Sequence, residues 1–371
     1  MPATARVRTG EGAISKVEVA AYTIPTDAPE SDGTLTWDRT TIVVVHATAD
    51  GVTGMGYAYA DASAAALITT MLAEVVKRRS AMDTEASYVA MMHAVRNAGR
   101  QGIAASAVSA VDVALWDLKA RMLGVPLVSL IGGVRDGIRI YGSGGFTSYS
   151  REQLQTQLGG WVAGGITAVK MKIGRDRLLD RERVAQAREA IGPHAELFVD
   201  ANGAYAAKPA LAEAERFADQ QVAWFEEPVS SDDLEGLRLV RERAPAGMDI
   251  AAGEYGYEPQ YFRRMAAAQA VDVLQADATR CGGVTGFLRA GAIADAWCLP
   301  LSAHTAPGIH THLCCSVARV RHLEYFHDHV RIERMLFDGI ADPSNGELRP
   351  DRSRPGLGLE LKLLDAERFA V

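Results

Sequence analysis

The stretch ITAVKMK, residues 166–172, is a short apolar run that closes on two lysines, and it sets the pattern for most of the chain. Comparable short apolar runs recur downstream, and helical stretches lie between most of them. The runs occupy residues 138–141, 166–172, 196–199, 222–225, 248–252, 271–275, 299–302 and a segment near Leu323. Successive strand–helix units of this kind favour a parallel sheet that closes into a barrel. The sequence therefore predicts an α/β barrel.

The helices between these runs carry start and stop signals. Ser150 with Gln153 three residues later forms a capping-box pattern, and Gly164-Gly165 ends the helix that follows. A second helix is expected over residues 180–191, before the break at Gly192-Pro193. These signals support the reading of one helix per strand.

The pattern before residue 136 is different, with extended and helical signals mixed. Residues 42–45 are a β-branched run followed by glycines at 51, 54 and 56, which predicts a hairpin-like pair with the glycines in turns. Residues 27–40 are rich in turn formers and acids, so a polar loop is expected there. Apolar positions on one stripe predict a helix over residues 104–122. We therefore expect a first domain over residues 1–135 and a barrel over 136–344.

Composition excludes several classes of protein. The chain has 371 residues, with 39 Lys and Arg against 46 Asp and Glu, for a net charge of −7. Without a cationic surplus, neither nucleic acid nor an anionic membrane is an expected partner. Four cysteines without CxxC spacing favour a reducing cytoplasm. No apolar stretch is long enough to span a bilayer, and the polar start lacks the apolar core of a secretory signal. A cytoplasmic protein is therefore expected.

A polar residue follows or ends seven successive barrel strands, where a buried strand should not tolerate one. From Lys172 onward these residues are 20 to 28 positions apart, which is about one strand–helix unit each. The set comprises Lys170, Lys172, Asp200, Glu226, Glu254, Asp277, His304 and Glu324. The carboxyl ends of barrel strands meet at one mouth, where active sites of this fold lie. A single acid after a strand is often a helix cap, but seven strands in succession argue for a site.

Three acids of this ring predict a metal. Asp200, Glu226 and Glu254 would bring three carboxylates together, and these repel one another unless a cation lies among them. Magnesium suits such hard oxygen ligands and keeps positions open for water and substrate. In FEEP, residues 225–228, either Glu226 or Glu227 could be the ligand, because alternation along the strand cannot decide without the register.

The ring also supplies candidate acids and bases. Lys170 and Lys172 point to the same face of a strand, where each is expected to lower the pKa of the other and make a neutral amine accessible as a base. Asp277 and His304 end neighbouring strands, so the carboxylate could orient the imidazole and favour its protonated form. This pair is a second acid or base. Other histidines, His310 among them, are expected in loops, helices or on the surface.

These motifs resemble the enolase superfamily, and within it the mandelate racemase subgroup. The resemblance covers nearly the whole chain, beginning with residues 105–133. It continues through KMK (170–172), DANG (200–203), FEEP (225–228), AAGE (251–254), QADATRCGG (275–283), SAHT (302–305) and LEYF (323–326). It implies a modified TIM barrel of seven strand–helix units and a final strand, (β/α)7β. An α+β capping domain, completed by a C-terminal tail of about 345–371, is implied above it.

The resemblance also implies roles. Asp200, Glu226 and Glu254 match the Mg²⁺ ligands; Lys172 matches a base on one face of the substrate, and His304 with Asp277 the base dyad on the other. Lys170 and Glu324 match groups at the substrate carboxylate, and Asn202 matches a position near the lysine face. Muconate cycloisomerases and dipeptide epimerases carry a lysine where this chain has Asp277. The pattern therefore resembles racemases and acid-sugar dehydratases.

The expected substrate is a small-molecule 2-hydroxy carboxylate. We expect dehydration of an acid sugar to a 2-keto-3-deoxy acid, because Tyr22, Trp37 and the polar segment 27–40 offer hydrogen-bonding groups suited to a polyol. The alternative enzyme is a 2-hydroxy acid racemase or epimerase, and a non-catalytic scaffold is the alternative from another class. The family is often multimeric, so a homo-oligomer is also expected.

Overall fold

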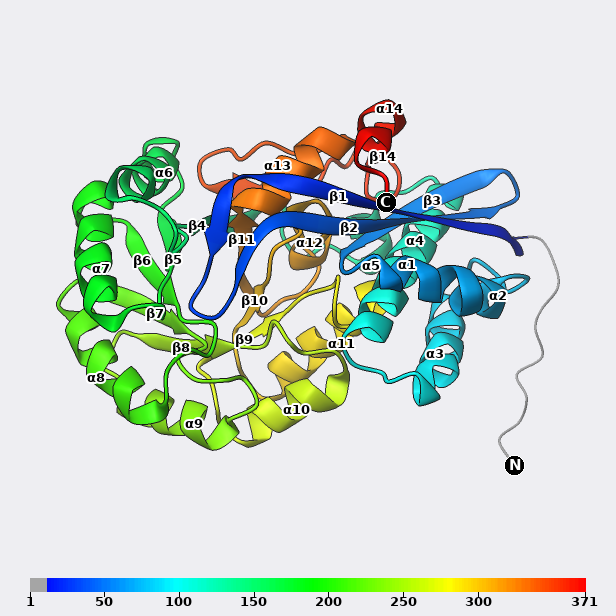
Figure 1. Ribbon diagram of the computed structural model, residues 1–371. Helices are drawn as coiled ribbons and strands as arrows, with labels where there is room; N and C mark the ends of the chain where they lie inside the picture. Colours follow the sequence, from blue (N-terminus) through cyan, green and yellow to red (C-terminus); the bar gives the residue numbers. More distant parts are fainter. Residues whose placement is uncertain (1–11) are drawn as a thin grey trace.

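The computed structural model describes residues 12–371 and consists of an antiparallel sheet with helices beside a closed parallel barrel (Figure 1). The sheet is formed by β1 (Ile14–Ser31), β2 (Thr36–Ala49) and β3 (Val52–Tyr59) in that order. The helical elements that follow are α1 (Ser63–Leu67), η1 (Ile68–Leu72), α2 (Ala73–Val76), α3 (Thr84–Ala94), η2 (Val95–Asn97), α4 (Ile103–Met122) and α5 (Leu127–Ile131).

Eight parallel strands form the barrel. They are β4 (Ile138–Gly144), β5 (Ala168–Lys172), β6 (Glu196–Asp200), β7 (Val222–Glu226), β8 (Asp249–Ala252), β9 (Val273–Ala276), β10 (Leu301–Ala303) and β11 (Val320–Phe326). The strands pair in sequence order, and β11 pairs with β4 to close the ring. Every strand predicted from a short apolar run is present.

A helix follows each of the first seven barrel strands, which confirms the (β/α)7β architecture. These helices are α6 (Arg151–Ala163), α7 (Arg177–Ile191), α8 (Ala207–Ala218), α9 (Leu234–Arg243), α10 (Pro259–Ala267), α11 (Gly283–Ala296) and α12 (Pro307–Cys314). Ser150 and Gln153 form the predicted capping box at α6. Helix α7 begins three residues earlier than expected, because the Asp176 side chain accepts from the backbone N–H of Leu178 and Leu179.

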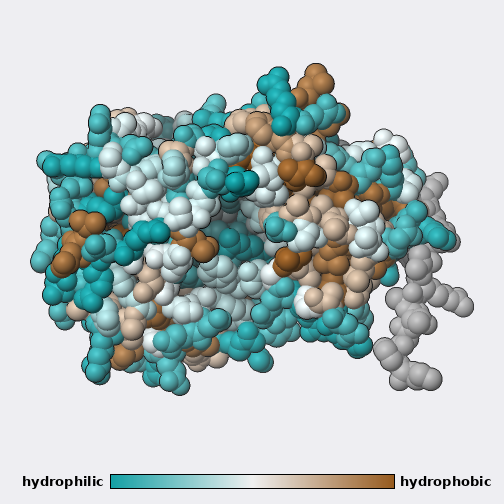
Figure 2. Space-filling model, viewed as in Figure 1, coloured by the Kyte–Doolittle hydropathy of each residue, from teal (hydrophilic) through white to brown (hydrophobic). Residues whose placement is uncertain are grey.

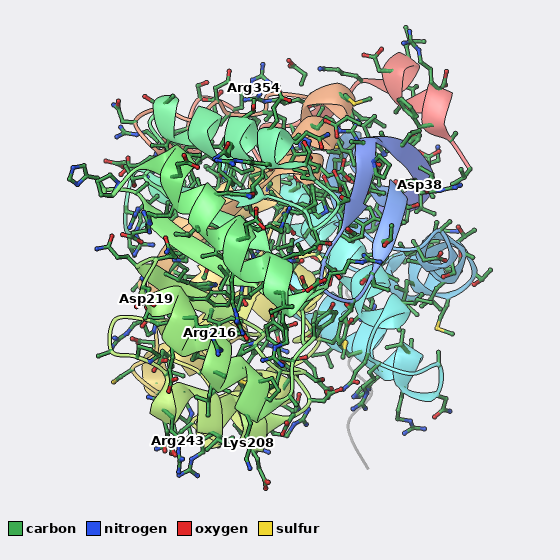
Figure 3. All side chains as sticks on the ribbon, turned by 60° about the vertical axis from the view of Figure 1, so that its left-hand side comes forward. Asp38, Lys208, Arg216, Asp219, Arg243 and Arg354 are labelled. Atoms are coloured by element: carbon green, nitrogen blue, oxygen red, sulfur yellow. The ribbon has the colours of Figure 1, made fainter. Side chains whose placement is uncertain are left out.

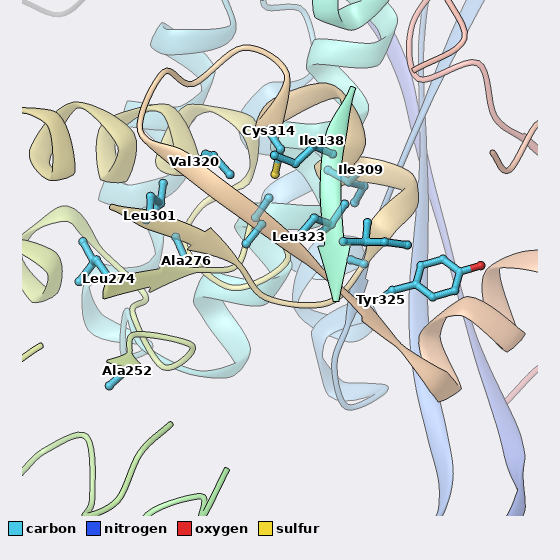
Figure 4. Close-up of a cluster of buried hydrophobic side chains, with 14 of the residues drawn as sticks. Ile138, Ala252, Leu274, Ala276, Leu301, Ile309, Cys314, Val320, Leu323 and Tyr325 are labelled. Atoms are coloured by element: carbon cyan, nitrogen blue, oxygen red, sulfur yellow. The ribbon is translucent and has the colours of Figure 1, made fainter. Parts of the chain in front are cut away.

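Apolar side chains fill the space between the barrel strands and the helices. Figure 4 shows such a layer around β9 to β11, with Leu274, Leu301 and Leu323 in the cluster. Charged side chains lie on the outer helices, as Figure 3 shows for Lys208 and Arg216 of α8. Burying one apolar face of each element against the next is what stabilises this arrangement.

The N-terminal domain is organised around α4, which runs along β2 and β3. The predicted helix over residues 104–122 is confirmed, although most of its circumference is buried rather than one stripe. The assignment of Gly54 and Gly56 to turns is wrong, since both lie within β3. A Cβ atom at either glycine would lie 2.2 to 2.3 Å from backbone atoms of α4, so glycine is needed for the close approach of helix and strand.

The expected polar loop over residues 27–40 is also wrong, because residues 27–31 extend β1 and 36–40 belong to β2. The turn is confined to residues 32–35. The hairpin reaches over the barrel (Figure 1), and Gly33 packs against the backbone of Ile173 and Ala201, just beyond the ends of β5 and β6. After an irregularity between Pro25 and Glu30, antiparallel pairing resumes as Glu30 with Trp37 and Ser31 with Thr36, which satisfies backbone groups near the turn within the sheet.

The C-terminal segment follows α13 (His327–Leu336) and returns to the N-terminal domain. It contains β12 (Phe337–Asp338), β13 (Glu347–Leu348), β14 (Glu360–Leu361), α14 (Leu363–Ala366) and η3 (Glu367–Phe369). Leu357 N–H donates to Asp117 of α4, and Val371 N–H donates to the carbonyl of Ala21 in β1. Within residues 12–371, no helix combines the length and apolar character needed to cross a membrane.

Candidate active site

Asp200, Glu226 and Glu254 converge at the carboxyl ends of β6, β7 and β8. One oxygen from each lies within 4.8 Å of the others, and all three side chains are buried. Oε2 of Glu254 has no hydrogen-bond partner among the described residues. Three buried carboxylates with hard oxygen donors match the ligand preference of magnesium, so the residues fit the predicted metal.

The register of β7 distinguishes the two glutamates of FEEP. Glu226 is the last residue of β7 and is the register partner of Asp200 on the neighbouring strand β6. Its Oε2 accepts from the indole N–H of Trp224 at 2.9 Å. Glu227 follows the strand with a φ of +37° and is buried beside the same cluster. Burial raises the pKa of Glu227 well above its ordinary value, and the charges of Glu254 and Asp200 add to this. Glu226 is therefore the glutamate of this pair that joins the three-carboxylate set.

Both lysines of β5 face the acids, as the two-residue spacing predicts. Nζ of Lys170 lies 2.6 Å from Glu226 and 2.9 Å from Glu324, while Nζ of Lys172 lies 2.5 Å from Asp200. The expected lowering of the lysine pKa values is wrong for this set of charges. Burial does lower them, but the surrounding carboxylates outweigh it and the pKa of each lysine is raised.

The two lysines do not neutralise all of the carboxylates around them. Burial raises the pKa of Glu226 to about 8, with the charge of Asp200 as the next cause. Glu254 differs, because the charges of His304 and Arg280 overcome its burial and lower its pKa to about 2. The carboxylates thus still compete for positive charge, which is a further sign that the cluster can accept a cation.

His304 and Asp277 form the predicted pair. Nδ1 of His304 lies 2.8 Å from Oδ2 of Asp277, and Nε2 lies 3.3 Å from Glu254. The other oxygen of Asp277 accepts from the backbone and hydroxyl of Thr279, which holds the carboxylate in place. Burial opposes protonation, but Glu254 and Glu324 outweigh it and raise the pKa of His304. The ring is oriented with Nε2 toward the cluster and favours its protonated form.

Glu324 of β11 completes the ring next to the dyad, with its Oε2 3.8 Å from Nε2 of His304. Its Oε1 accepts from the Ser143 hydroxyl at 2.6 Å, and its Oε2 accepts from the backbone N–H of Thr305 at 3.2 Å. Burial raises its pKa, but the charges of Lys170 and His304 dominate and lower it to about 2. Glu324 is therefore ionised, and Ser143, Thr305 and Lys170 hold its two oxygens in place.

Two residues of this region were not anticipated from the sequence. Arg280 lies 3.2 Å from Glu254 and 3.7 Å from Asp277, so it bridges the acidic set and the dyad. His310, expected in a loop, helix or on the surface without a role, is fully buried in α12. Its Nε2 accepts from the N–H of Ala278 and its Nδ1 donates to the carbonyl of Thr305. It thereby ties together the residues that follow Asp277 and His304.

The residues predicted to bind substrate lie in three different places. Asn202 follows β6 with a φ of +46°, and its buried Oδ1 is without a hydrogen-bond partner in the part of the chain that the structure describes. Trp37 lies on the hairpin, donates to Glu30 and packs edge-on against Phe146. Tyr22 of β1 is buried in the hydrophobic core of the protein, and its backbone forms an antiparallel bridge with Ala370 of the C-terminal segment. A hydrophilic hollow lies at the middle of the face shown in Figure 2.

Comparisons with known proteins agree with this architecture. Two protein-family models match the chain. The family model described as mandelate racemase/muconate lactonizing enzyme, N-terminal domain, matches residues 15–132, and the family model described as enolase C-terminal domain-like matches residues 153–366. A curated relative, 3,6-anhydro-alpha-L-galactonate cycloisomerase from Streptomyces coelicolor, is 33% identical over 96% of this chain and 99% of its own. Other curated relatives include dehydratases of sugar acids.

Solved structures show the same relationship. A mandelate racemase/muconate lactonizing enzyme-like protein from Rubrobacter xylanophilus is 53% identical, with a TM-score of 0.95 over 97% of this chain and 100% of that chain. L-talarate/galactarate dehydratase from Salmonella typhimurium, liganded with Mg and L-lyxarohydroxamate, is 27% identical. Its TM-score is 0.89 over 97% of this chain and 93% of that chain. The chain therefore belongs to the mandelate racemase and muconate lactonizing enzyme family, within the enolase-like proteins.

Proposed function

We propose that this protein removes the α-proton of a sugar acid and eliminates water from it, giving a 2-keto-3-deoxy acid. One observation carries the proposal. Lys172 and His304 come from strands that are not neighbours in the barrel, yet both reach the same carboxylate set, at Asp200 and at Glu254. An amine and an imidazole that flank one site are suited to act on different faces of a bound substrate.

Asp200, Glu226 and Glu254 would hold Mg²⁺. When bound, the ion would supply positive charge next to the substrate carboxylate, which makes the α-proton more acidic and stabilises the charge that develops. Lys170 and Ser143 lie beside Glu324 and would orient the substrate carboxylate.

The protein's own residues account for the proton movements. Positive charge held by Asp200, Glu226 and Glu254 would offset the carboxylates that raise the pKa of Lys172, which makes its neutral amine accessible. In the proposed dehydration, neutral Lys172 takes the α-proton, and the electron pair of that C–H bond forms a double bond to the neighbouring carbon as its hydroxyl leaves. His304, favoured in its protonated form beside Asp277, donates a proton to the departing hydroxyl so that water is released. The enol that remains tautomerises to the 2-keto acid.

A second candidate reaction is a cycloisomerisation, as named for the Streptomyces coelicolor relative. In a 3,6-anhydro sugar acid, the group on the carbon next to the deprotonated one is a ring ether oxygen. The same acid could then protonate that oxygen, which opens the ring without loss of water. A racemase differs again, because the proton returns to the α-carbon.

The experiment is incubation of the protein with Mg²⁺ and a panel of aldonic, aldaric and 3,6-anhydro sugar acids. Dehydration is expected to give a 2-keto acid with the mass of water lost, and chelation by EDTA is expected to abolish the reaction until Mg²⁺ is restored. Cycloisomerisation would give a carbonyl product of unchanged mass. Solvent deuterium at the α-carbon with inversion and no keto product would contradict both and identify a racemase. Inactivity on every acid, with no deuterium exchange, would favour the scaffold.

A further inference from the structure

We propose that Asp27, Glu30 and His327 form a second divalent-cation site, which joins the β1–β2 hairpin to the barrel. Asp27 and Glu30 belong to β1, and His327 is the first residue of α13, directly after β11. One ligand atom from each lies within 4.8 Å of the others. The hairpin passes β11 and α13 in Figure 1, and Arg331 of α13 donates to the carbonyl of Pro25 in β1. These contacts place the three residues at the junction between the two domains.

Glu30 provides an independent indication that a ligand binds here. Its side chain is 0% exposed, and its Oε1 has no hydrogen-bond partner within residues 12–371. Its other oxygen accepts from the indole N–H of Trp37 at 2.8 Å. A buried carboxyl oxygen without a donor is costly, and a cation among these side chains would satisfy it.

The charges around Glu30 are mostly negative. Burial raises its pKa to about 8, and the carboxylates of Asp328 and Asp27 add to this. Arg331 is the nearby cation, but it is paired with Asp328 at 2.6 Å. The imidazole of His327 lies 2.9 Å from Asp27 and contributes a positive charge only when protonated. A divalent cation among Asp27, Glu30 and His327 would offset the two carboxyl groups of the cluster.

The donor set distinguishes this site from the one in the barrel. One imidazole nitrogen with two carboxylate oxygens suits borderline ions such as Zn²⁺ or Co²⁺, whereas three carboxylates suit Mg²⁺. A surface hollow lined by Asp27, Tyr149, Gln157, Trp161 and His327 gives access from solvent. Bound metal would fix the hairpin, whose turn packs over the ends of β5 and β6. The role is therefore a structural clamp, separate from the chemistry proposed for the barrel.

The test is calorimetric titration of the metal-stripped full-length protein with Zn²⁺ in the presence of saturating Mg²⁺. One Zn²⁺ per chain is expected to bind outside the barrel. His327→Gln is expected to weaken this binding at least about tenfold, since even outer partners of metal ligands change affinity by this much. Asp27→Asn should weaken it as well. His194→Gln, which alters an exposed histidine elsewhere, should bind as the wild type does.

Two further measurements separate this site from the barrel. Asp200→Asn, which alters the barrel acids, should keep the Zn²⁺ site. Co²⁺ should quench the fluorescence of Trp37, and Trp37→Phe should remove that part of the quenching, because the Trp37 indole contacts Glu30 directly. Equal Zn²⁺ stoichiometry and affinity in the wild type and His327→Gln would overturn the proposal. Loss of the Zn²⁺ site in Asp200→Asn alone would assign the binding to the barrel and would also overturn it.

Discussion

The two ends of the barrel interior differ sharply, although they are built on the same strands. Toward the amino ends, the interior is filled by Tyr141, Phe198 and Trp224, with Phe198 and Trp224 stacked at 5.3 Å. Two residues further along, β6 and β7 carry Asp200 and Glu226. Since side chains alternate along a strand, residues two apart point into the same interior. A step of two residues thus separates an aromatic layer from a charged one.

The comparison shows how the charged layer is supported. The aromatic layer closes the barrel below the charges and contacts them directly. The Trp224 indole donates to Glu226, and Nζ of Lys170 lies 5.5 Å from the centre of the Tyr141 ring. Charges above a sealed apolar floor interact more strongly than they would in water. The floor should therefore govern stability, and the charged ring should govern activity.

The largest effect should come from the charged ring. Lys172→Ala and His304→Ala should each reduce turnover about 10³- to 10⁴-fold, since each removes a proposed acid or base, which corresponds to about 4 to 5 kcal/mol. Thermal unfolding should change little by comparison. The measurement is kcat on the sugar acid that the panel identifies. Lys208→Ala and His194→Ala alter exposed residues and are the matched controls. A modest loss in both ring variants would show that neither residue transfers the proton.

The aromatic floor should respond in the opposite way. Trp224→Ala should lower the free energy of unfolding by about 3 to 5 kcal/mol, because it leaves a cavity in a fully buried layer. Denaturant unfolding measures this. Trp224→Phe keeps most of the buried ring and removes the N–H donor to Glu226, so its loss of stability should be smaller. If the two variants were equally destabilised, the hydrogen bond rather than the packing would support the floor.

A buried carboxyl group outside the charged ring should make the stability of the protein depend on pH. Glu333 of α13 is fully buried and accepts from Tyr57 at 2.6 Å, and burial raises its pKa to about 8. Because the folded pKa lies above the unfolded one, its contribution is complete below about pH 4.5 and is lost as the pH rises through 8. Wild-type stability should fall by about 2 kcal/mol between pH 6 and 8 from this group, at up to 1.4 kcal/mol per unit.

Glu333→Gln tests this assignment, since the amide has a similar shape but does not ionise. Its stability relative to wild type should rise between pH 6 and 8 in urea unfolding experiments. Parallel pH profiles for the two proteins would show that Glu333 does not titrate in this range.

The smallest expected effect concerns the support of the dyad. His310→Leu removes both hydrogen bonds that tie Ala278 to Thr305, and kcat should fall about tenfold, or about 1.4 kcal/mol, with little change in KM. The pH profile of kcat should also shift, because the geometry of His304 and Asp277 changes. His310→Gln can replace one of the bonds and should restore part of the loss. An unshifted pH profile would mean that His310 stabilises the fold without positioning the dyad.

Sequence reasoning succeeded where one local rule decides. The strands of the barrel, the helix of residues 104–122 and the capping box at Ser150 follow from periodicity and end signals, and all are present. It failed for the hairpin of residues 27–40, because antiparallel pairing between β1 and β2 overrides the turn-forming composition. It also failed for Gly54 and Gly56, whose role depends on a helix sixty residues further along.

The sequence by itself determined which strand end carries each acid, lysine and histidine, because strand alternation and unit spacing are local properties. Tertiary structure alone decided that Glu226 rather than Glu227 joins Asp200 and Glu254, and that the lysines have raised pKa values. It also revealed His310 between two strand ends and the cluster of Asp27, Glu30 and His327. The physical reason is that register, burial and electrostatic interaction depend on distances between residues far apart in the chain, which only the folded structure sets.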